Sequence, residues 1–263
     1  MRGRGRWWLA ALLACAPTGC DSDGDVDAGP GVDAGADRTD GGGTPACDFR
    51  AVDGIVVIEA ESLPITEDWA TGSHGDAAGG EYVEWTGSSH NNDTSNGRFE
   101  VSILVEEAGL YRLQVRNRVG MGDDATEHND TWMQFPDAAA FYGIQGPSDA
   151  QDRVYPRPRC EDAGFISGIE AMDDVAEASC PEGTSRDGYF KVYSSGALDW
   201  KWSARTSDSD AHDIVVRFDA PGVYTYQLAA RGSFHQLDRI VIHRIELEDS
   251  EVRDLALEET SCR

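Results

Sequence analysis

The chain has 263 residues, of which 48 are acidic and 22 are Lys or Arg, and its formal net charge is −26 at pH 7. Charge this negative repels phosphate backbones and anionic lipid surfaces, which excludes nucleic acid as a partner and direct adsorption to a membrane. The part after residue 46 has a length that suits one β-sandwich with insertions or two small domains.

The first 20 residues are arranged as an export signal. Arg2, Arg4 and Arg6 precede the apolar run WWLAALLA. This run is shorter than the ~20 residues that span a bilayer, and no later segment qualifies. LLAC, ending at Cys15, resembles a bacterial lipobox, whose cysteine is lipidated; PTGC, ending at Cys20, and a plain secreted protein are the alternatives. We therefore expect export, with a lipid anchor at Cys15 as the only membrane attachment.

Residues 21–46 consist almost entirely of Asp, Gly, Ala and Pro. Such a segment cannot bury enough apolar surface to offset its chain entropy, so it is predicted to be a flexible, self-repelling linker. The folded domain is expected to span residues 47–263.

Apolar residues in this domain alternate along the chain, as in half-buried strands. The alternating runs are 99–105, 111–115, 214–218, 224–228 and 240–242, separated by turns such as EEAG and DAPG. This pattern predicts an all-β fold, an antiparallel β-sandwich or jelly roll with little helix.

The alternation stops between residues 138 and 187. A long aperiodic stretch inside a compact domain is typically a functional or disulfide-stapled excursion, so we predict a loop insertion there. Within it, GIEAMDDVAEAS is a candidate for a short surface helix.

Four cysteines of the predicted domain can form two disulfides in three ways. Position favours Cys160 with Cys180, which closes a local loop, and Cys47 with Cys262, which joins the two ends of the domain. The second pairing requires the first and last strands to be neighbours.

Glu59 and Glu61 interrupt the apolar stretch VVIEAES. In a strand they would point to the same face, opposite Val56, Ile58 and Ala60. That face is either solvated or screened by a hard cation such as calcium, with Asp238 of the last predicted strand as a third carboxylate.

Several segments resemble a known family when taken in order: IEAES, GGEYVEW, AGLYRLQVRNR and LDRIVI. They are similar to the galactose-binding-like β-sandwiches of carbohydrate-binding module families 6 and 35. A branch of these found in secreted and lipoprotein polysaccharide-utilisation proteins is resembled more closely by HNDTWMQFPD, VYPRPR, DGYFKVYSSGALDWKWSARTSDSDAH and GSFHQLDRIVIH. The resemblance implies a structural calcium ion held by Glu59, Glu61 and Asp238, and a glycan as the ligand.

Sugar sites combine exposed aromatic rings with amide, carboxylate or guanidinium groups. Trp200 and Trp202 are candidates for a platform, although at least one of them is expected in the core. Trp132 has the same alternative, and His235 could instead be a loop histidine bonded to the backbone. The candidate carbohydrate-binding residues are Trp200, Trp202, Arg231, His235, Asn129, Asp130 and Trp132.

No GxSxG or HExxH motif is present, and no acidic pair stands in a motif that marks a hydrolase. We therefore predict non-catalytic, calcium-stabilised polysaccharide binding by a monomer. The alternatives are a calcium-dependent adhesion or scaffold domain that binds protein, and a jelly-roll polysaccharide lyase.

Overall fold

A computed structural model describes residues 46–66, 68–145, 152–161, 177–194, 198–207 and 209–262. The predicted signal peptide with Cys15, the linker up to residue 45 and most of the candidate helix GIEAMDDVAEAS lie outside these ranges. Within them, no helix has the length and apolar character needed to cross a membrane.

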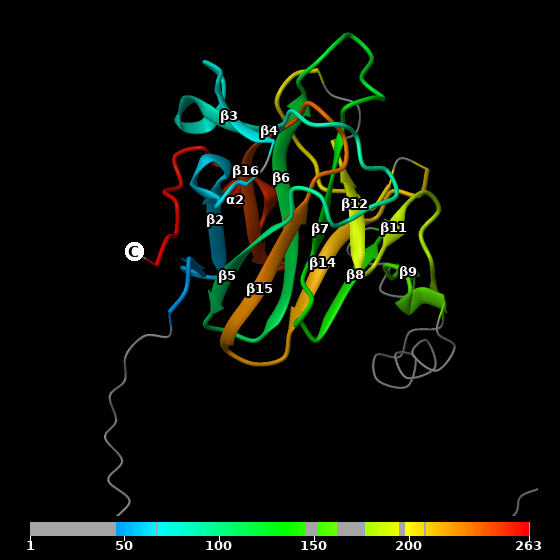
Figure 1. The fold of residues 1–263 in the computed structure, drawn as a ribbon. Helices are drawn as coiled ribbons and strands as arrows, with labels where there is room; N and C mark the ends of the chain where they lie inside the picture. Colours follow the sequence, from blue (N-terminus) through cyan, green and yellow to red (C-terminus); the bar gives the residue numbers. More distant parts are fainter. Residues whose placement is uncertain are drawn as a thin grey trace, which may run out of the picture. The chain divides into compact units, whose positions relative to one another are not determined.

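The strands form two packed sheets, which confirms the predicted sandwich (Figure 1). One sheet has the order β1 (Phe49–Arg50), β5 (Phe99–Val105), β15 (Gly222–Ala229), β7 (Asp130–Gln134), β12 (Tyr189–Tyr193), β11 (Ser185–Arg186). The other has the order β10 (Glu177–Ser179), β9 (Asp152–Val154), β8 (Ala140–Ile144), β14 (Asp213–Phe218), β6 (Gly109–Val119), β16 (His235–Arg244), β4 (Glu81–Trp85), β3 (Trp69–Ser73). Beside this path, β2 (Ile55–Glu59) pairs with β16, and β13 (Lys201–Trp202) pairs with β6. Most pairs are antiparallel; β1 with β5 and β10 with β9 are parallel.

The core lies between the sheets and includes the buried residues that the alternation predicted. Leu113 of β6 and Ile240 of β16 meet Val101 and Leu228 of the facing sheet in one apolar cluster. The side chains between them along each strand face outward, because strand side chains repeat every second residue. This outward set on β6, β7, β12 and β15 is where the polar groups of interest lie.

Helical structure is limited in the described ranges to one α-helix and three short 3₁₀ segments. They are α2 (Asp249–Val252), η1 (Ala60–Ser62), η2 (Ala78–Gly80) and η3 (Arg159–Glu161). The prediction of little helix is confirmed.

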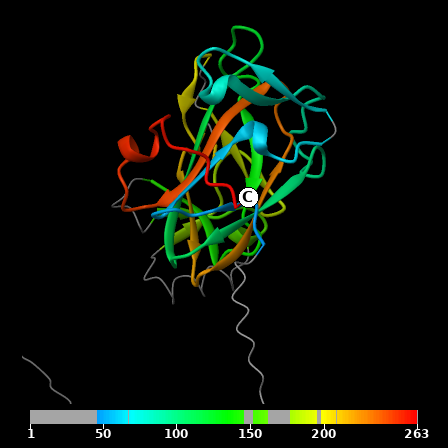
Figure 2. The ribbon, with the colours of Figure 1, turned by 90° about the vertical axis from the view of Figure 1, so that its left-hand side faces the viewer.

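The two ends of the domain are joined, as predicted. Cys47 and Cys262 form a disulfide, and the C-terminal segment runs beside β1 and β2 (Figure 2). Thr260 links these two strands, because its carbonyl accepts from Arg50 N and its amide donates to Val57 O. Antiparallel pairing of β2 with β16 confirms that the first and last long strands are neighbours.

The predicted insertion is more regular than its sequence suggests. Cys160 and Cys180 do form a disulfide, but the segment also contributes β8, β9, β10 and β11. In β8, Phe141 faces the main core while Ala140 and Tyr142 face a second apolar cluster. A strand that is buried on both faces shows no alternation, which is why the periodicity was not visible.

The stretch VVIEAES differs from the single strand that we predicted. β2 ends at Glu59, and Ala60–Ser62 form the 3₁₀ turn η1. The rule that places Glu59 and Glu61 on one strand face therefore does not apply, and each carboxylate has its own surroundings.

Candidate functional site

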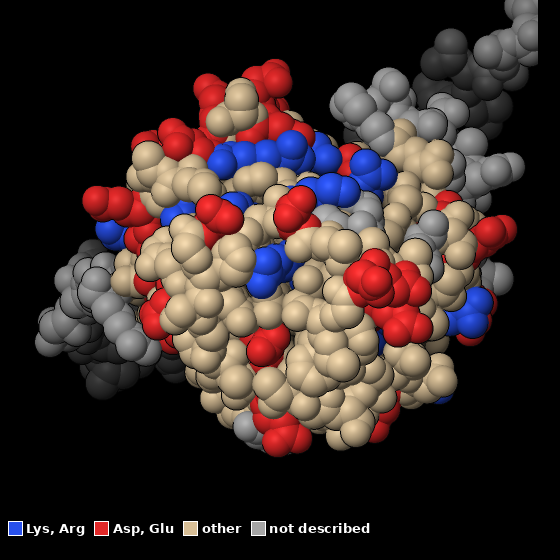
Figure 3. Space-filling view, turned by 90° about the horizontal axis from the view of Figure 1, so that it is seen from above, with Lys and Arg blue, Asp and Glu red and all other residues tan. Residues whose placement is uncertain are grey.

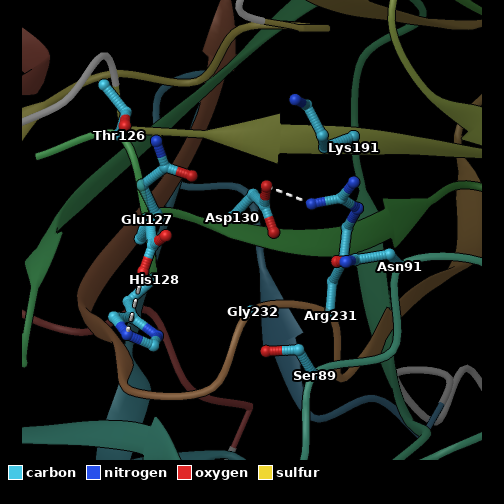
Figure 4. A pocket seen from close by; sticks show the side chains of 10 residues that line it. Ser89, Asn91, Thr126, Glu127, His128, Asp130, Lys191, Arg231 and Gly232 are labelled. Carbon is cyan, nitrogen blue, oxygen red and sulfur yellow. Dashed lines mark hydrogen bonds and ion pairs between the residues drawn. The ribbon is translucent and has the colours of Figure 1, made fainter. Parts of the chain in front are cut away.

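A polar pocket lies at the end of the sandwich where β6 and β15 end and β7 and β16 begin. It has a volume of about 410 Å³, and loops after β4, β6 and β15 surround it together with β12. Seen from above, Lys and Arg side chains gather at this end of the molecule, with acidic side chains around them (Figure 3). The pocket is lined by Ser89, Asn91, Thr126, Glu127, His128, Asn129, Asp130, Lys191, Arg231 and Gly232 (Figure 4).

An ion pair between Asp130 and Arg231 forms the centre of this pocket (Figure 4). Their side chains are only 7% and 10% exposed. Asp130 Oδ2 accepts from Arg231 Nη1, whereas Asp130 Oδ1 and Arg231 Nε are buried without a hydrogen-bond partner. A buried polar atom left unpaired costs about 1–3 kcal/mol, so this pair can gain by bonding a ligand.

Gly232 allows this arrangement by its lack of a side chain. Its amide donates to Asp130 O at 2.9 Å, and a Cβ atom there would stand 3.1 Å from Asp130 Oδ1. Any larger residue would crowd the open carboxylate oxygen.

Trp132 lies beneath the ion pair and is fully buried. The Arg231 guanidinium is 5.0 Å from the centre of its ring, and its Nε1 donates to His90 O at 3.0 Å. This residue belongs to the core beneath the pocket and offers no ring face for a sugar, which is the alternative that the sequence left open.

His235 is also a core residue. Its ring bonds Thr131 Oγ1 at 2.8 Å and Asn117 Oδ1 at 3.0 Å. Burial, followed by the charge of Arg231, lowers the pKa of His235 to about 3, so the ring is neutral near pH 7. It positions β16 against β7 and does not line the pocket.

His128 and Lys191 line the pocket but were not among the predicted carbohydrate-binding residues. His128 adopts a positive φ of 54°, and its Nδ1 is 2.6 Å from Ser233 O, which turns the ring along the pocket wall. Lys191 belongs to β12 and pairs with Trp132 of the neighbouring strand β7. The pattern YFKVY, which places a lysine in the outward set of an apolar strand, was the available signal. Asn129, a predicted carbohydrate-binding residue, also lines the pocket.

The structure does not bring Trp200 and Trp202 to this pocket. Trp200 Nε1 donates to His74 Nδ1 at 3.1 Å, and the Arg118 guanidinium is 4.9 Å from its ring centre. Trp202 packs against the apolar cluster of Val57, Val241 and Val252. The predicted pair is therefore split between two surroundings on the outer face of the larger sheet.

The three predicted calcium ligands are divided in a similar way. Glu59 accepts two hydrogen bonds from Arg239. Asp238 accepts from Arg116 and, at 2.8 Å, from Ala78 N. Within the described ranges, no group of three or more His, Cys, Asp or Glu side chains is arranged to hold a metal ion.

Of these three carboxylates, only that of Glu61 has an oxygen without a hydrogen-bond partner, the buried Oε2. Burial, and then the charges of Glu59, Asp238 and Glu81, raises the pKa of Glu61 to about 7. An orphaned carboxylate oxygen among negative charges fits a cation chemically. Glu59 and Asp238 each pair with an arginine, but their carboxylate oxygens keep further lone pairs that can bind a cation.

Neither the protein-family models nor the curated proteins contain a match to this chain. Among solved structures, it is similar to a family 35 carbohydrate binding module from Clostridium thermocellum, with 14% identity over 72% of this chain and 98% of that one (TM-score 0.37). It is similar to a GH26-CBM35 beta-(1,4)-mannanase from Podospora anserina, with 14% identity over 75% of this chain (TM-score 0.38), but the match spans only 29% of the mannanase. A third similarity, to an isomalto-dextranase from Arthrobacter globiformis T6 complexed with panose, has 14% identity and covers 73% of this chain and 23% of that one (TM-score 0.37).

Proposed function

We propose that this domain binds carbohydrate, without cleaving it, in the pocket around Asp130 and Arg231. The observation that supports this most strongly is Asp130 Oδ1, a buried acceptor without a partner beside a half-satisfied guanidinium. The carboxylate accepts a hydrogen bond from one hydroxyl and the guanidinium beside it donates to the next, which suits a vicinal diol of a sugar.

The remaining lining groups suit the same ligand. Ser89, Asn91 and Thr126 can both donate and accept, and Lys191 adds a cation on the side opposite Glu127. None of the described residues that line the pocket is Trp, Tyr or Phe. Recognition would thus depend on hydrogen bonds to hydroxyl groups and not on stacking, and we expect modest affinity for one sugar unit.

The variant Asp130→Asn is expected to weaken glycan binding at least tenfold. The Asp130 carboxylate can pair with Arg231 through one oxygen and accept from a hydroxyl through the other, whereas an asparagine side chain has a single oxygen. Lys191→Met should weaken it less, about fivefold, since one donor is lost from the rim. Binding is measured by affinity gel electrophoresis with polysaccharides chosen from a glycan array.

The matched control is Lys201→Met, which removes an exposed lysine of β13 outside the pocket and should leave retardation unchanged. Circular dichroism establishes that each variant is folded. A folded Asp130→Asn protein with unchanged retardation would refute the pocket. Capture of a protein partner without any glycan retention would favour the adhesion alternative, and release of unsaturated products from uronate polymers would favour the lyase.

Export and anchoring belong to the same proposal. Two disulfides are typical of an oxidising compartment, which supports an exported domain. Lipidation at Cys15 would attach it to a membrane, and the acidic linker would give the monomeric domain reach toward a polysaccharide.

We also propose calcium as a stabilising ion beside Glu61, with Glu59 and Asp238 as further ligands. The support is the open Glu61 oxygen and the negative charge around it. Bound calcium would supply positive charge that offsets this repulsion.

In EDTA, the free energy of unfolding is expected to fall as pH rises from about 4.5 to 7. The pKa of Glu61 is raised in the folded state, so its proton stabilises the fold below the unfolded value and this gain is lost as pH passes the folded value near 7. Because Glu61 is partly exposed, we expect a change of about 1 kcal/mol, well below the full value of the shift.

The variant Glu61→Gln should flatten this pH dependence and abolish any rise in melting temperature on adding calcium. Glu81→Gln, which removes a nearby exposed carboxylate, should keep both responses. Calcium that raises the melting temperature of Glu61→Gln as much as that of the wild type would contradict the proposed site.

A further inference from the structure

A second pocket lies on the larger sheet, at the point along β6 where its pairing partner changes from β14 to β13. β14 pairs with β6 at Gly109–Arg112, and β13 pairs with it at Arg116–Asn117. Leu113 and Gln114 lie between these pairings and line a pocket of about 270 Å³. It shares no lining residue with the Asp130 pocket.

Three arginines and two carboxylates surround this opening. Arg112 pairs with Asp213 at 2.8 Å and with Asp249 at 3.3 Å. Arg205 also pairs with Asp213, at 2.9 Å, and Arg253 pairs with Asp249 at 2.8 Å. Each carboxylate is thus shared by two guanidinium groups, and the cluster keeps one positive charge in excess.

This excess is unusual in a chain whose net charge is −26. His243 lies next to a residue that lines the pocket, with its Nε2 3.5 Å from Gln114 Nε2. Burial lowers the pKa of His243, whereas a hydrogen bond to the Arg244 backbone raises it. Among the nearby charges, Arg112 and Arg253 lower it and Asp249 raises it. The charged side chains of this cluster thus carry a net positive charge, in contrast to the chain as a whole.

The arginines are held in place before any ligand arrives. Gln114 accepts from Arg253 Nη2 at 2.9 Å and donates to Asp249 Oδ1 at 2.9 Å, so it connects both sides of the cluster. Fixed guanidinium groups lose little entropy when they bind a planar anion. Arg205 is the most exposed member, with 43% of its side chain accessible.

Two aromatic side chains complete the wall. Trp202 packs against the cluster of Val57, Val241 and Val252 and also lines the pocket. Tyr193 lines it from the end of β12. An aromatic wall beside arginines suits a ligand that combines an apolar C–H face with an anionic group.

We infer that this pocket is a second ligand site, which recognises the carboxylate or sulfate of a small anionic sugar unit. Arg205 and Arg253 bind the oxyanion, and Trp202 contacts the ring that bears it. The inference does not depend on the Asp130 pocket, since the two sites share no residue.

Galacturonate, inorganic sulfate and galactose are the probes, titrated into the full-length protein labelled with ¹⁵N-tryptophan. The indole signal of Trp202, assigned from Trp202→Phe, should shift with galacturonate and not with galactose, and sulfate should compete. Arg205→Gln should weaken the galacturonate response at least fivefold, because it removes a donor and the excess charge. Arg244→Gln removes a comparably exposed arginine elsewhere and should change the affinity less than twofold.

The Asp130→Asn variant separates this inference from the proposed function, because it alters only the first pocket and should leave the Trp202 response as in the wild type. Equal shifts with galactose and galacturonate would overturn the inference. The absence of any shift of the Trp202 indole signal would also overturn it, as would equal losses of galacturonate affinity in Arg205→Gln and Arg244→Gln. A response that disappears in Asp130→Asn but persists in Arg205→Gln would assign the anion to the first pocket and also overturn it.

Discussion

Removal of the disulfide between Cys47 and Cys262 is expected to lower the free energy of unfolding by about 5 kcal/mol. The two residues are separated by 215 positions, so the bond closes almost the whole domain into one loop. In the chain-entropy treatment, a loop this long restricts the unfolded chain more than any local bridge can. The measurement is urea denaturation of the double variant Cys47→Ser/Cys262→Ser.

The matched control is Cys160→Ser/Cys180→Ser, which opens a loop of 20 positions and should cost about 3 kcal/mol. Thr260 and Ser261 still pair with β1 and β2 in the first variant, so the C-terminal segment can dock without the bond. A loss of under 1 kcal/mol would mean that these backbone bonds alone close the domain. A larger loss from the shorter loop would contradict the entropic account.

The sandwich could be predicted because its central strands bury one face each. The alternation along 99–105, 214–218 and 224–228 follows directly from that geometry, and β5, β14 and β15 occur there. β8 was missed because both of its faces are apolar. The turn η1 was missed because Ala60 and Glu61 continue the alternation of β2 after the strand has ended. Periodicity reports which side chains are buried and not which backbone conformation buries them.

The pocket was predictable only in part, for a related reason. Asn129 and Asp130 were chosen from their place at a loop-to-strand junction, and Arg231 from the family resemblance, which implies ligand contacts in the loop before the last strand. The structure brings the three residues to one pocket. No pattern in the sequence indicates that Asp130 and Arg231 pair with each other, because their contact depends on the pairing of β7 with β15 across the sheet.

The tryptophans show the opposite error. Trp200 and Trp202 have the spacing of one strand face, but only Lys201–Trp202 form a strand. Trp200 precedes it, and its ring lies near His74 and Tyr82. Spacing predicts a shared face only where both residues belong to the same strand.

The second large effect is expected at the ion pair of Arg116 with Asp238. The variant Arg116→Met should lower the free energy of unfolding by about 3–5 kcal/mol in EDTA at pH 7, because the fully buried Asp238 side chain would lose its cation. Chemical denaturation measures the loss. Burial already raises the pKa of Asp238 while Arg116 lowers it, so the variant should raise it further. Protonation of Asp238 then removes the unpaired buried charge, so the loss of stability in Arg116→Met should become smaller as the pH falls toward 4.

Arg244 provides the matched control, since it pairs with Glu107 at the surface, where that carboxylate is 62% exposed. Arg244→Met should leave the free energy of unfolding close to that of the wild type, because water solvates the carboxylate that is left behind. Similar losses for the two variants would show that burial does not govern these pairs. Calcium adds a further criterion: an ion that binds between Glu61 and Asp238 replaces the missing guanidinium charge, so it should restore more stability to Arg116→Met than to the wild type. If calcium leaves the Arg116→Met deficit unchanged, Asp238 is not among its ligands, and the arginine alone balances this buried carboxylate.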